Sequence, residues 1–113
     1  MINQGEIYLA DLDPTVPHPV IVVSREEFNR GDRVVAELCT SSKFAVRSKL
    51  PNGVPIRAGQ FGMTKDCVAQ CENLLLVNKE ALHPGPLGLL DALRLREVIK
   101  AIGHVLDSAC EPN

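Results

Sequence analysis

His18 is the first residue of this chain whose type and setting suggest chemistry. Residues 15–24 read TVPHPVIVVS, so two prolines flank the histidine and a run of β-branched residues follows at once. Histidine titrates near neutral pH and can act as an acid or as a base. Two interpretations follow: a polar residue that the turn requires, or a reactive group at the mouth of a strand.

Hydroxyl and acidic side chains gather at the ends of two other predicted strands. Thr40, Ser41 and Ser42 end the segment RVVAELCTSS. Their hydroxyls could donate hydrogen bonds to a phosphate, or they could simply terminate the strand. Asp11 and Asp13 are two residues apart and could form a carboxylate pair on one strand face, but capping of the turn that follows also explains Asp13.

The chain has four cysteines, Cys39, Cys67, Cys71 and Cys110. Cys67 and Cys71 are four residues apart and lie on the same side of a predicted strand. No second CxxC and no HxxxH supplies the remaining ligands of a metal site. We therefore favour buried thiols over a metal site, and we expect no metal and no other cofactor.

Length and charge narrow the class of protein. The chain has 113 residues, of which 45% are hydrophobic and 23% charged, and a net charge of −2. This is typical of one globular domain with one core. Residues 40–65 carry no acid but five bases, which could either contact a polyanion or form a solvated loop: Lys43, Arg47, Lys49, Arg57 and Lys65.

The start of the chain, MINQGEIYLADLD, lacks the basic and apolar regions of a secretory signal. No apolar stretch reaches the length that a membrane-spanning helix needs. We expect a cytoplasmic protein without membrane association.

Hydrophobic patterns predict strands first and a helix last. Strands are predicted at 5–13, 19–24, 33–42 and 67–78, the second buried on both faces and the last bent or bulged near Glu72 and Asn73. Residues 51–53 (PNG) mark a turn between two short extended pieces, and LHPGPLG predicts no regular structure. Asp91 can cap a helix over about 91–109 with an apolar stripe: Leu95, Val98, Ile102, Val105 and Ala109.

These elements predict a mainly β, small twisted barrel over about residues 5–80 with a C-terminal helix, in a single domain that covers 1–113. Four segments, in order, resemble landmarks of the MazF/PemK family of toxin endoribonucleases: GEIYLADLDPT, HPVIVVSREEFNR, VVAELCTSS and GMTKDCVAQCENLLLVNKEAL. The similarity runs from Gly5 to about Val105. It implies an SH3-like β-barrel of the MazF/PemK/CcdB type, and a homodimeric type II toxin that cleaves single-stranded RNA without a metal and binds a cognate antitoxin.

The resemblance also implies a site. The family's catalytic arginine and threonine correspond to His18 and Thr40, which are therefore the expected catalytic pair. Histidine can serve as base or acid but gives up the fixed charge and two-pronged donor geometry of arginine. The loop before His18 is also shorter than in the family, with only Val16 and Pro17 after DPT. Residues expected to bind RNA or phosphate are Arg25, Ser41, Ser42, Lys43, Lys65, Asp66 and Gln70.

The sequence leaves a second class of function open. A catalytically degenerate relative would bind RNA or an antitoxin without cleaving RNA, and a CcdB-like toxin would act on a protein target. Enzymatic activity is thus the favoured hypothesis, and it depends on whether His18 sustains catalysis.

Overall fold

The structure is a computed structural model that describes residues 1–107 and Ala109. Strands, two α-helices and two 3-10 turns follow one another along the described chain. In order they are β1 (Glu6–Ala10), β2 (His18–Val22), η1 (Glu26–Phe28), β3 (Arg33–Thr40), α1 (Phe44–Arg47), β4 (Gly53–Ile56), β5 (Cys67–Asn78), η2 (Lys79–Ala81), β6 (Gly88–Leu89) and α2 (Ala92–Leu106).

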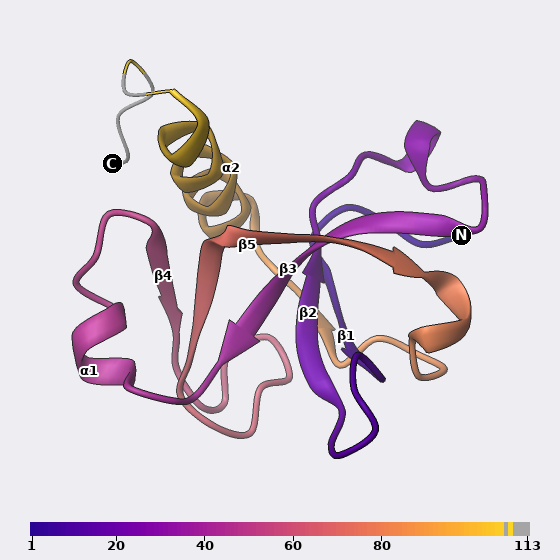
Figure 1. The fold of residues 1–113 in the computed structure, drawn as a ribbon, viewed down its shortest axis with the longest axis horizontal. Helices are drawn as coiled ribbons and strands as arrows, with labels where there is room; N and C mark the ends of the chain where they lie inside the picture. The colour runs from indigo at the N-terminus through magenta and orange to yellow at the C-terminus, as the bar shows by residue number, and fades with distance from the viewer. Residues whose placement is uncertain (108, 110–113) are drawn as a thin grey trace.

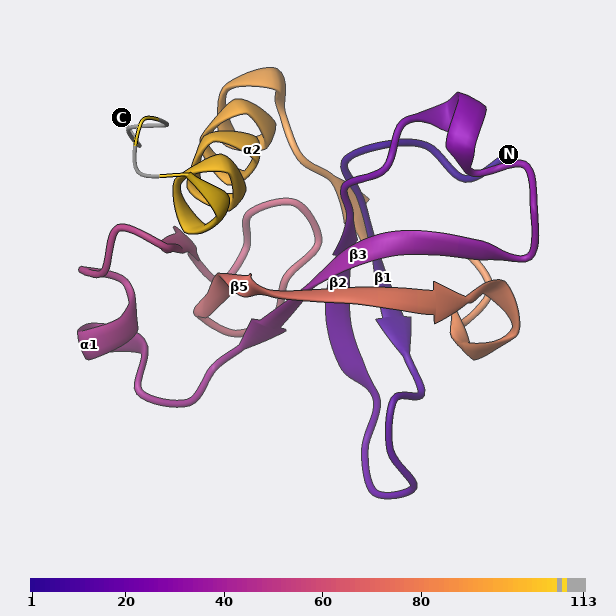
Figure 2. The same ribbon diagram turned by 45° about the horizontal axis from the view of Figure 1, so that its top comes forward.

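The strands form one curled antiparallel sheet in the order β4-β5-β3-β2-β1-β6. Figures 1 and 2 show the sheet curving as a half-barrel, with α2 packed beside its β4 and β5 end. The predicted fold class, a mainly β barrel-like sheet with a C-terminal helix, is confirmed. No helix in the described part of the chain is long and apolar enough to cross a membrane.

Both faces of the sheet carry buried apolar side chains. Ile7 and Ile21 belong to a cluster that includes Val98 of α2, whereas Val20 and Val22 belong to a second cluster on the other face. Successive residues of β2 thus enter different clusters, because side chains alternate along a strand. The prediction that this segment is buried on both faces is confirmed.

Strand β5 bends where the sequence predicts it. Glu37 of β3 pairs with Leu74, but Cys39 pairs with Ala69, so the register shifts by three residues across a bulge. Up to the bulge β5 pairs with both β4 and β3, and beyond it β5 pairs with β3. The bulge allows one strand to belong to two differently oriented halves of the curled sheet.

The loop between β4 and β5 spans the gap between the two edge strands, β4 and β6. Gly62 and Gly88 make this contact possible. A Cβ on Gly62 would lie 1.9 Å from the carbonyl oxygen of Leu87, and a Cβ on Gly88 would lie 2.0 Å from that of Phe61. The two backbones therefore touch directly, and Gly62 also has a φ of +83°, which favours glycine.

Several elements differ from the prediction. Strands β1 and β3 end at Ala10 and Thr40, before the predicted ends at 13 and 42. The side chain of Asp91 caps α2 as expected, accepting from the Arg94 amide at 2.8 Å, but α2 ends at Leu106, three residues before the predicted end. Residues 44–47, predicted to be extended, form α1, which starts after a left-handed Lys43. A two-residue strand, β6, begins at Gly88, the last residue of the segment predicted to be irregular.

Candidate functional site

The β2–β3 pair brings His18 and Thr40 to one end of the sheet. His18 is the first residue of β2 and Thr40 is the last residue of β3. The strands are antiparallel and pair Val20 with Leu38, so the same register continued by two residues places His18 opposite Thr40. Both residues line a pocket of about 480 Å³.

The rim of this pocket is polar and its floor is apolar. Ser41, Ser42 and Lys65 line it together with His18 and Thr40, so five of the residues predicted for the site meet there. The floor includes buried side chains at Cys39, Met63 and Cys67. Hydroxyls, an imidazole and one ammonium group thus surround a space with an apolar base.

His18 is held by a carboxylate from the β1–β2 loop. Its Nε2 lies 2.9 Å from Oδ2 of Asp13. The other oxygen of Asp13 accepts a hydrogen bond from the backbone N–H of Thr15 at 2.8 Å and another from the Thr15 hydroxyl. The Thr15 hydroxyl and amide, with a further contribution from His18, hold the pKa of Asp13 well below its usual range. Asp13 is therefore ionised at neutral pH.

Asp13 and Asp11 do not form a carboxylate pair. Oδ1 of Asp11 lies 2.8 Å from Nε2 of His83, in the segment after η2. The two aspartates thus contact different histidines. Asp13 caps its turn and also contacts His18. The sequence pointed to the capping role but carried no signal for the second contact.

Thr40 keeps a hydroxyl proton available. Its Oγ1 accepts a hydrogen bond from the backbone N–H of Ser42 at 3.2 Å. Because this bond uses an oxygen lone pair, the O–H can still donate toward the pocket. Thr40 is half-buried at the edge of the sheet, where its position is set by β3.

Arg25 does not belong to this pocket. It follows β2 at the end opposite His18. Its guanidinium lies 3.6 Å from a carboxylate oxygen of Glu27 and stacks 5.3 Å from the ring centre of Phe28. The hypothesis that Arg25 supplies charge beside His18 therefore fails, because a strand separates the two residues.

Three other predicted residues do not line the pocket. Asp66 braces the β4–β5 loop, accepting from the Ala58 amide at 2.8 Å and from Arg57 at 3.2 Å. Gln70 lines a different, smaller pocket of about 130 Å³. Lys43 is exposed and directly follows Ser42, without lining the pocket.

The three described cysteines are free and buried, which confirms the prediction of buried thiols. Burial raises the pKa of Cys71 to about 12 and that of Cys39 well above its usual value. These thiols are thus protonated and poor nucleophiles at neutral pH. Cys110 lies outside the described residues.

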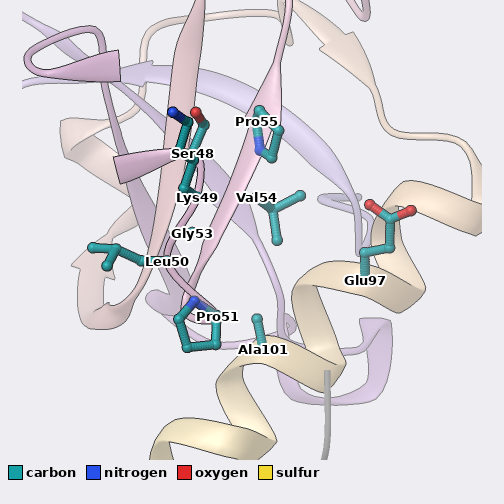
Figure 3. Close-up of a pocket in the computed structure, with 9 residues that line it drawn as sticks. All are labelled: Ser48, Lys49, Leu50, Pro51, Gly53, Val54, Pro55, Glu97 and Ala101. Carbon is teal, nitrogen blue, oxygen red and sulfur yellow. The ribbon is translucent and has the colours of Figure 1, made fainter. Parts of the chain in front are cut away.

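A second pocket of about 410 Å³ lies between β4 and α2 (Figure 3). Figure 3 shows Glu97 and Ala101 on α2 and, opposite them, Val54 and Pro55 on β4. The Glu97 carboxylate is already paired with Arg94 at 2.8 Å. None of the residues predicted for the site lines this pocket, so the His18 pocket is the better candidate for chemistry.

Comparison with known proteins identifies the family. Residues 3–106 match PemK-like, MazF-like toxins of type II toxin–antitoxin systems. The chain is 27% identical over 88 residues to Endoribonuclease EndoA of Bacillus subtilis, covering 73% of this chain and 75% of that protein. It is 26% identical over 108 residues to Endoribonuclease MazF of Staphylococcus saprophyticus, covering 90% and 88%.

Solved structures share the fold. A mycobacterial endoribonuclease in complex with its cognate antitoxin superposes with a TM-score of 0.78 at 21% identity, over 94% of this chain and 95% of that one. The Mycobacterium tuberculosis toxin MazF-mt6 gives 0.76 at 24% identity, over 90% and 96%. The resemblance found in the sequence is thus confirmed, and the chain belongs to the family of PemK-like, MazF-like toxins of type II toxin–antitoxin systems.

Proposed function

We propose that this toxin is an endoribonuclease that cleaves single-stranded RNA without a metal or another cofactor. The observation that carries the proposal is the meeting of His18 and Thr40, far apart in sequence, in one pocket with Ser41, Ser42 and Lys65. Its volume of about 480 Å³ is in the usual range for small-ligand sites and suits one nucleotide of a strand. Two relatives of this chain, from Bacillus subtilis and Staphylococcus saprophyticus, are named endoribonucleases.

The pocket supplies the groups that cleavage through the ribose 2′-hydroxyl needs. His18 removes the 2′-hydroxyl proton, and the 2′-oxygen attacks the adjacent phosphorus. The bond from phosphorus to the 5′-oxygen breaks, and that oxygen takes a proton from solvent. The hydroxyl of Thr40 and the ammonium group of Lys65 stabilise the charge on the phosphate oxygens. The products are a 2′,3′-cyclic phosphate and a 5′-hydroxyl end.

The partners follow from the same proposal. We propose that a cognate antitoxin protein binds this chain and that the chain forms a homodimer in the cytoplasm, where RNA is accessible. A solved complex of a mycobacterial endoribonuclease with its cognate antitoxin, which shares this fold, supports the first point. The one-sided pairing of the second half of β5 supports the second.

The test is cleavage of a mixed-sequence RNA in excess EDTA. We expect the wild-type protein to produce 5′-hydroxyl ends. His18→Ala loses an acid–base group and Thr40→Ala loses a donor to the developing charge, so each should cleave roughly a hundredfold more slowly or worse. Arg25→Ala is the matched control, because Arg25 lies outside the pocket, and its rate should stay near that of the wild type. Equal cleavage by wild type and His18→Ala would refute the assignment.

His18 stands where the resemblance implies an arginine, and this favours one alternative, a protein that binds RNA or antitoxin without cleaving RNA. In that case the wild type would bind RNA in EDTA and produce no 5′-hydroxyl ends. A titration of labelled RNA beside the cleavage assay distinguishes the two functions.

A further inference from the structure

We propose that Asp13 is a positioning residue that holds the Nε2–H of His18 and leaves Nδ1 as the nitrogen that takes the 2′-hydroxyl proton. This inference rests on the proposed nuclease function and assigns a reactive atom within it. It arises from the 2.9 Å contact between Nε2 of His18 and Oδ2 of Asp13.

The β1–β2 hairpin explains how Asp13 reaches His18. Ala10 pairs with His18, so residues 11–17 form a closed loop and Asp13 folds back onto the start of β2. The two oxygens of Asp13 have separate tasks. Oδ1 accepts the amide and the hydroxyl of Thr15, whereas Oδ2 faces Nε2 of His18. Because the hydrogen bonds from Thr15 hold Oδ1, the carboxylate cannot rotate freely. Oδ2 therefore remains in contact with Nε2 of His18.

The contact decides which nitrogen of His18 is free. An ionised carboxylate only accepts hydrogen bonds, so neutral His18 must place its proton on Nε2 and its lone pair on Nδ1. Asp13 is ionised at neutral pH, since the bonds from Thr15 stabilise its charge. When Nδ1 takes a proton from the RNA, the neighbouring carboxylate also stabilises the imidazolium that forms.

The other groups around the pocket leave Asp13 as the partner that orients the ring. Lys65, from the β4–β5 loop, also lines the pocket, and its ammonium group repels an imidazolium. The thiols of Cys39 and Cys67, from β3 and β5, are neutral because burial raises the pKa of each. The hydroxyls of Thr40, Ser41 and Ser42 complete the polar lining.

The substitution Asp13→Asn separates positioning from turn capping. An asparagine oxygen still accepts from the Thr15 amide, so the turn is retained. Its NH₂ group would now face His18 and donate to Nε2, so the ring proton would move to Nδ1. Nδ1 would then have no lone pair with which to accept the 2′-hydroxyl proton. Asp13→Ser also keeps a turn-capping oxygen but is too short to reach the ring.

The experiment is ¹⁵N NMR of histidine-labelled full-length protein without RNA, followed by kinetics. We expect His18 in the Nε2–H form in wild type and in the Nδ1–H form in Asp13→Asn. Asp11→Asn is the matched control, since its 2.8 Å contact is to His83, and it should leave His18 unchanged. In cleavage assays Asp13→Asn and Asp13→Ser should lower kcat at least tenfold with little change in KM.

The split between kcat and KM adds a readout that a purely structural role would not give. Loss of the turn would weaken RNA binding and raise KM, whereas a misplaced ring proton lowers kcat alone. An unchanged His18 tautomer in Asp13→Asn, or an unchanged kcat in both variants, would overturn the positioning role alone. A wild type that shows the Nε2–H form but cuts no RNA would overturn the nuclease, and with it the catalytic use of this contact.

Discussion

Glu37 is an acidic side chain buried in the core without a compensating charge. It lies on β3 and is fully buried, and neither carboxylate oxygen has a hydrogen-bond partner among the described residues. Burial, and then the nearby charge of Glu72, raise the pKa of Glu37 to about 8. At neutral pH it is therefore mostly protonated, since an ionised carboxylate would be too costly in this environment.

The buried carboxyl makes stability depend on pH. The pKa of Glu37 rises from the usual 4.5 of a glutamate to about 8 in the folded chain, so the folded state binds more protons than the unfolded state between these values. Stability should fall as the pH rises through this window, by up to about 1.4 kcal/mol per pH unit, and level off above it. Urea unfolding from pH 5 to 9 would measure this.

Glu37→Gln should remove this slope, because an amide does not titrate. Glu80→Gln is the control, as Glu80 is exposed. A wild-type stability that changes with pH in parallel with that of Glu37→Gln would show that Glu37 ionises equally in both states.

His18→Arg restores the residue that relatives are expected to carry. Arginine does not lose its proton near neutral pH, whereas histidine does. The variant should bind the RNA phosphate at least as tightly, so KM should not rise, and the near-neutral limb of the kcat/KM pH profile should disappear. Single-turnover cleavage from pH 5 to 9 would measure both. A limb that persists in His18→Arg would mean that another group titrates in the reaction.

Sequence predicted some site residues and missed others for identifiable reasons. The order of motifs pointed to His18 and Thr40, and antiparallel pairing of β2 and β3 explains why they meet. The contact from Asp13 depends on how a closed loop folds back, which spacing alone does not specify. Glu37 did leave a signal, because it lies two residues from Cys39 and thus on the same, inward face of β3.

At the scale of elements, the contact between the β4–β5 loop and β6 supports the site. Gly62 lines the His18 pocket and touches the Leu87 backbone. Gly62→Ala would place a methyl group 1.9 Å from a carbonyl oxygen, at a φ of +83°. The loop must move, so we expect a loss of roughly 2–4 kcal/mol in unfolding free energy, measured by urea denaturation.

Gly59→Ala is the matched control for this loop. Gly59 has a similar φ of +89°, but a Cβ there would have no neighbour within 4 Å. The unfolding free energy of Gly59→Ala should fall by only about 1–2 kcal/mol, the cost of placing an alanine in a left-handed backbone conformation. Equal losses in the two variants would show that the contact with β6 contributes nothing beyond backbone strain.

The elements that sequence missed are those with little periodicity. Four residues in α1 and two in β6 are too few for a hydrophobic repeat to be recognised. Both depend on tertiary contacts: the guanidinium of Arg57 stacks 5.0 Å from the ring centre of Phe44 in α1, and β6 pairs with β1. The longer strands and α2 carry their own pattern, so they were predictable.

At the scale of the whole molecule, one edge of the second half of β5 is open, since no other strand of the described residues pairs with it. Residues 74–78 pair with β3 on one side, and β4 pairs with β5 only before the bulge. Figure 1 shows this part of β5 extending away from β4 across the molecule. Leu74 and Leu76 are 38% and 63% exposed there. An open strand edge with exposed leucines is a template for pairing with another strand.

This edge is where the proposed homodimer can be tested. Leu76→Asp places a charge on the edge, a device by which natural proteins block strand pairing, and should convert a dimer to a monomer. Light scattering after size-exclusion chromatography over a concentration series would measure the mass. Val46→Asp is the control, because Val46 is 64% exposed on α1, away from any open strand edge. If Leu76→Asp stays dimeric at the lowest concentrations where the wild type does, the subunits must associate through another face, and the leucines of β5 would then be available to the antitoxin.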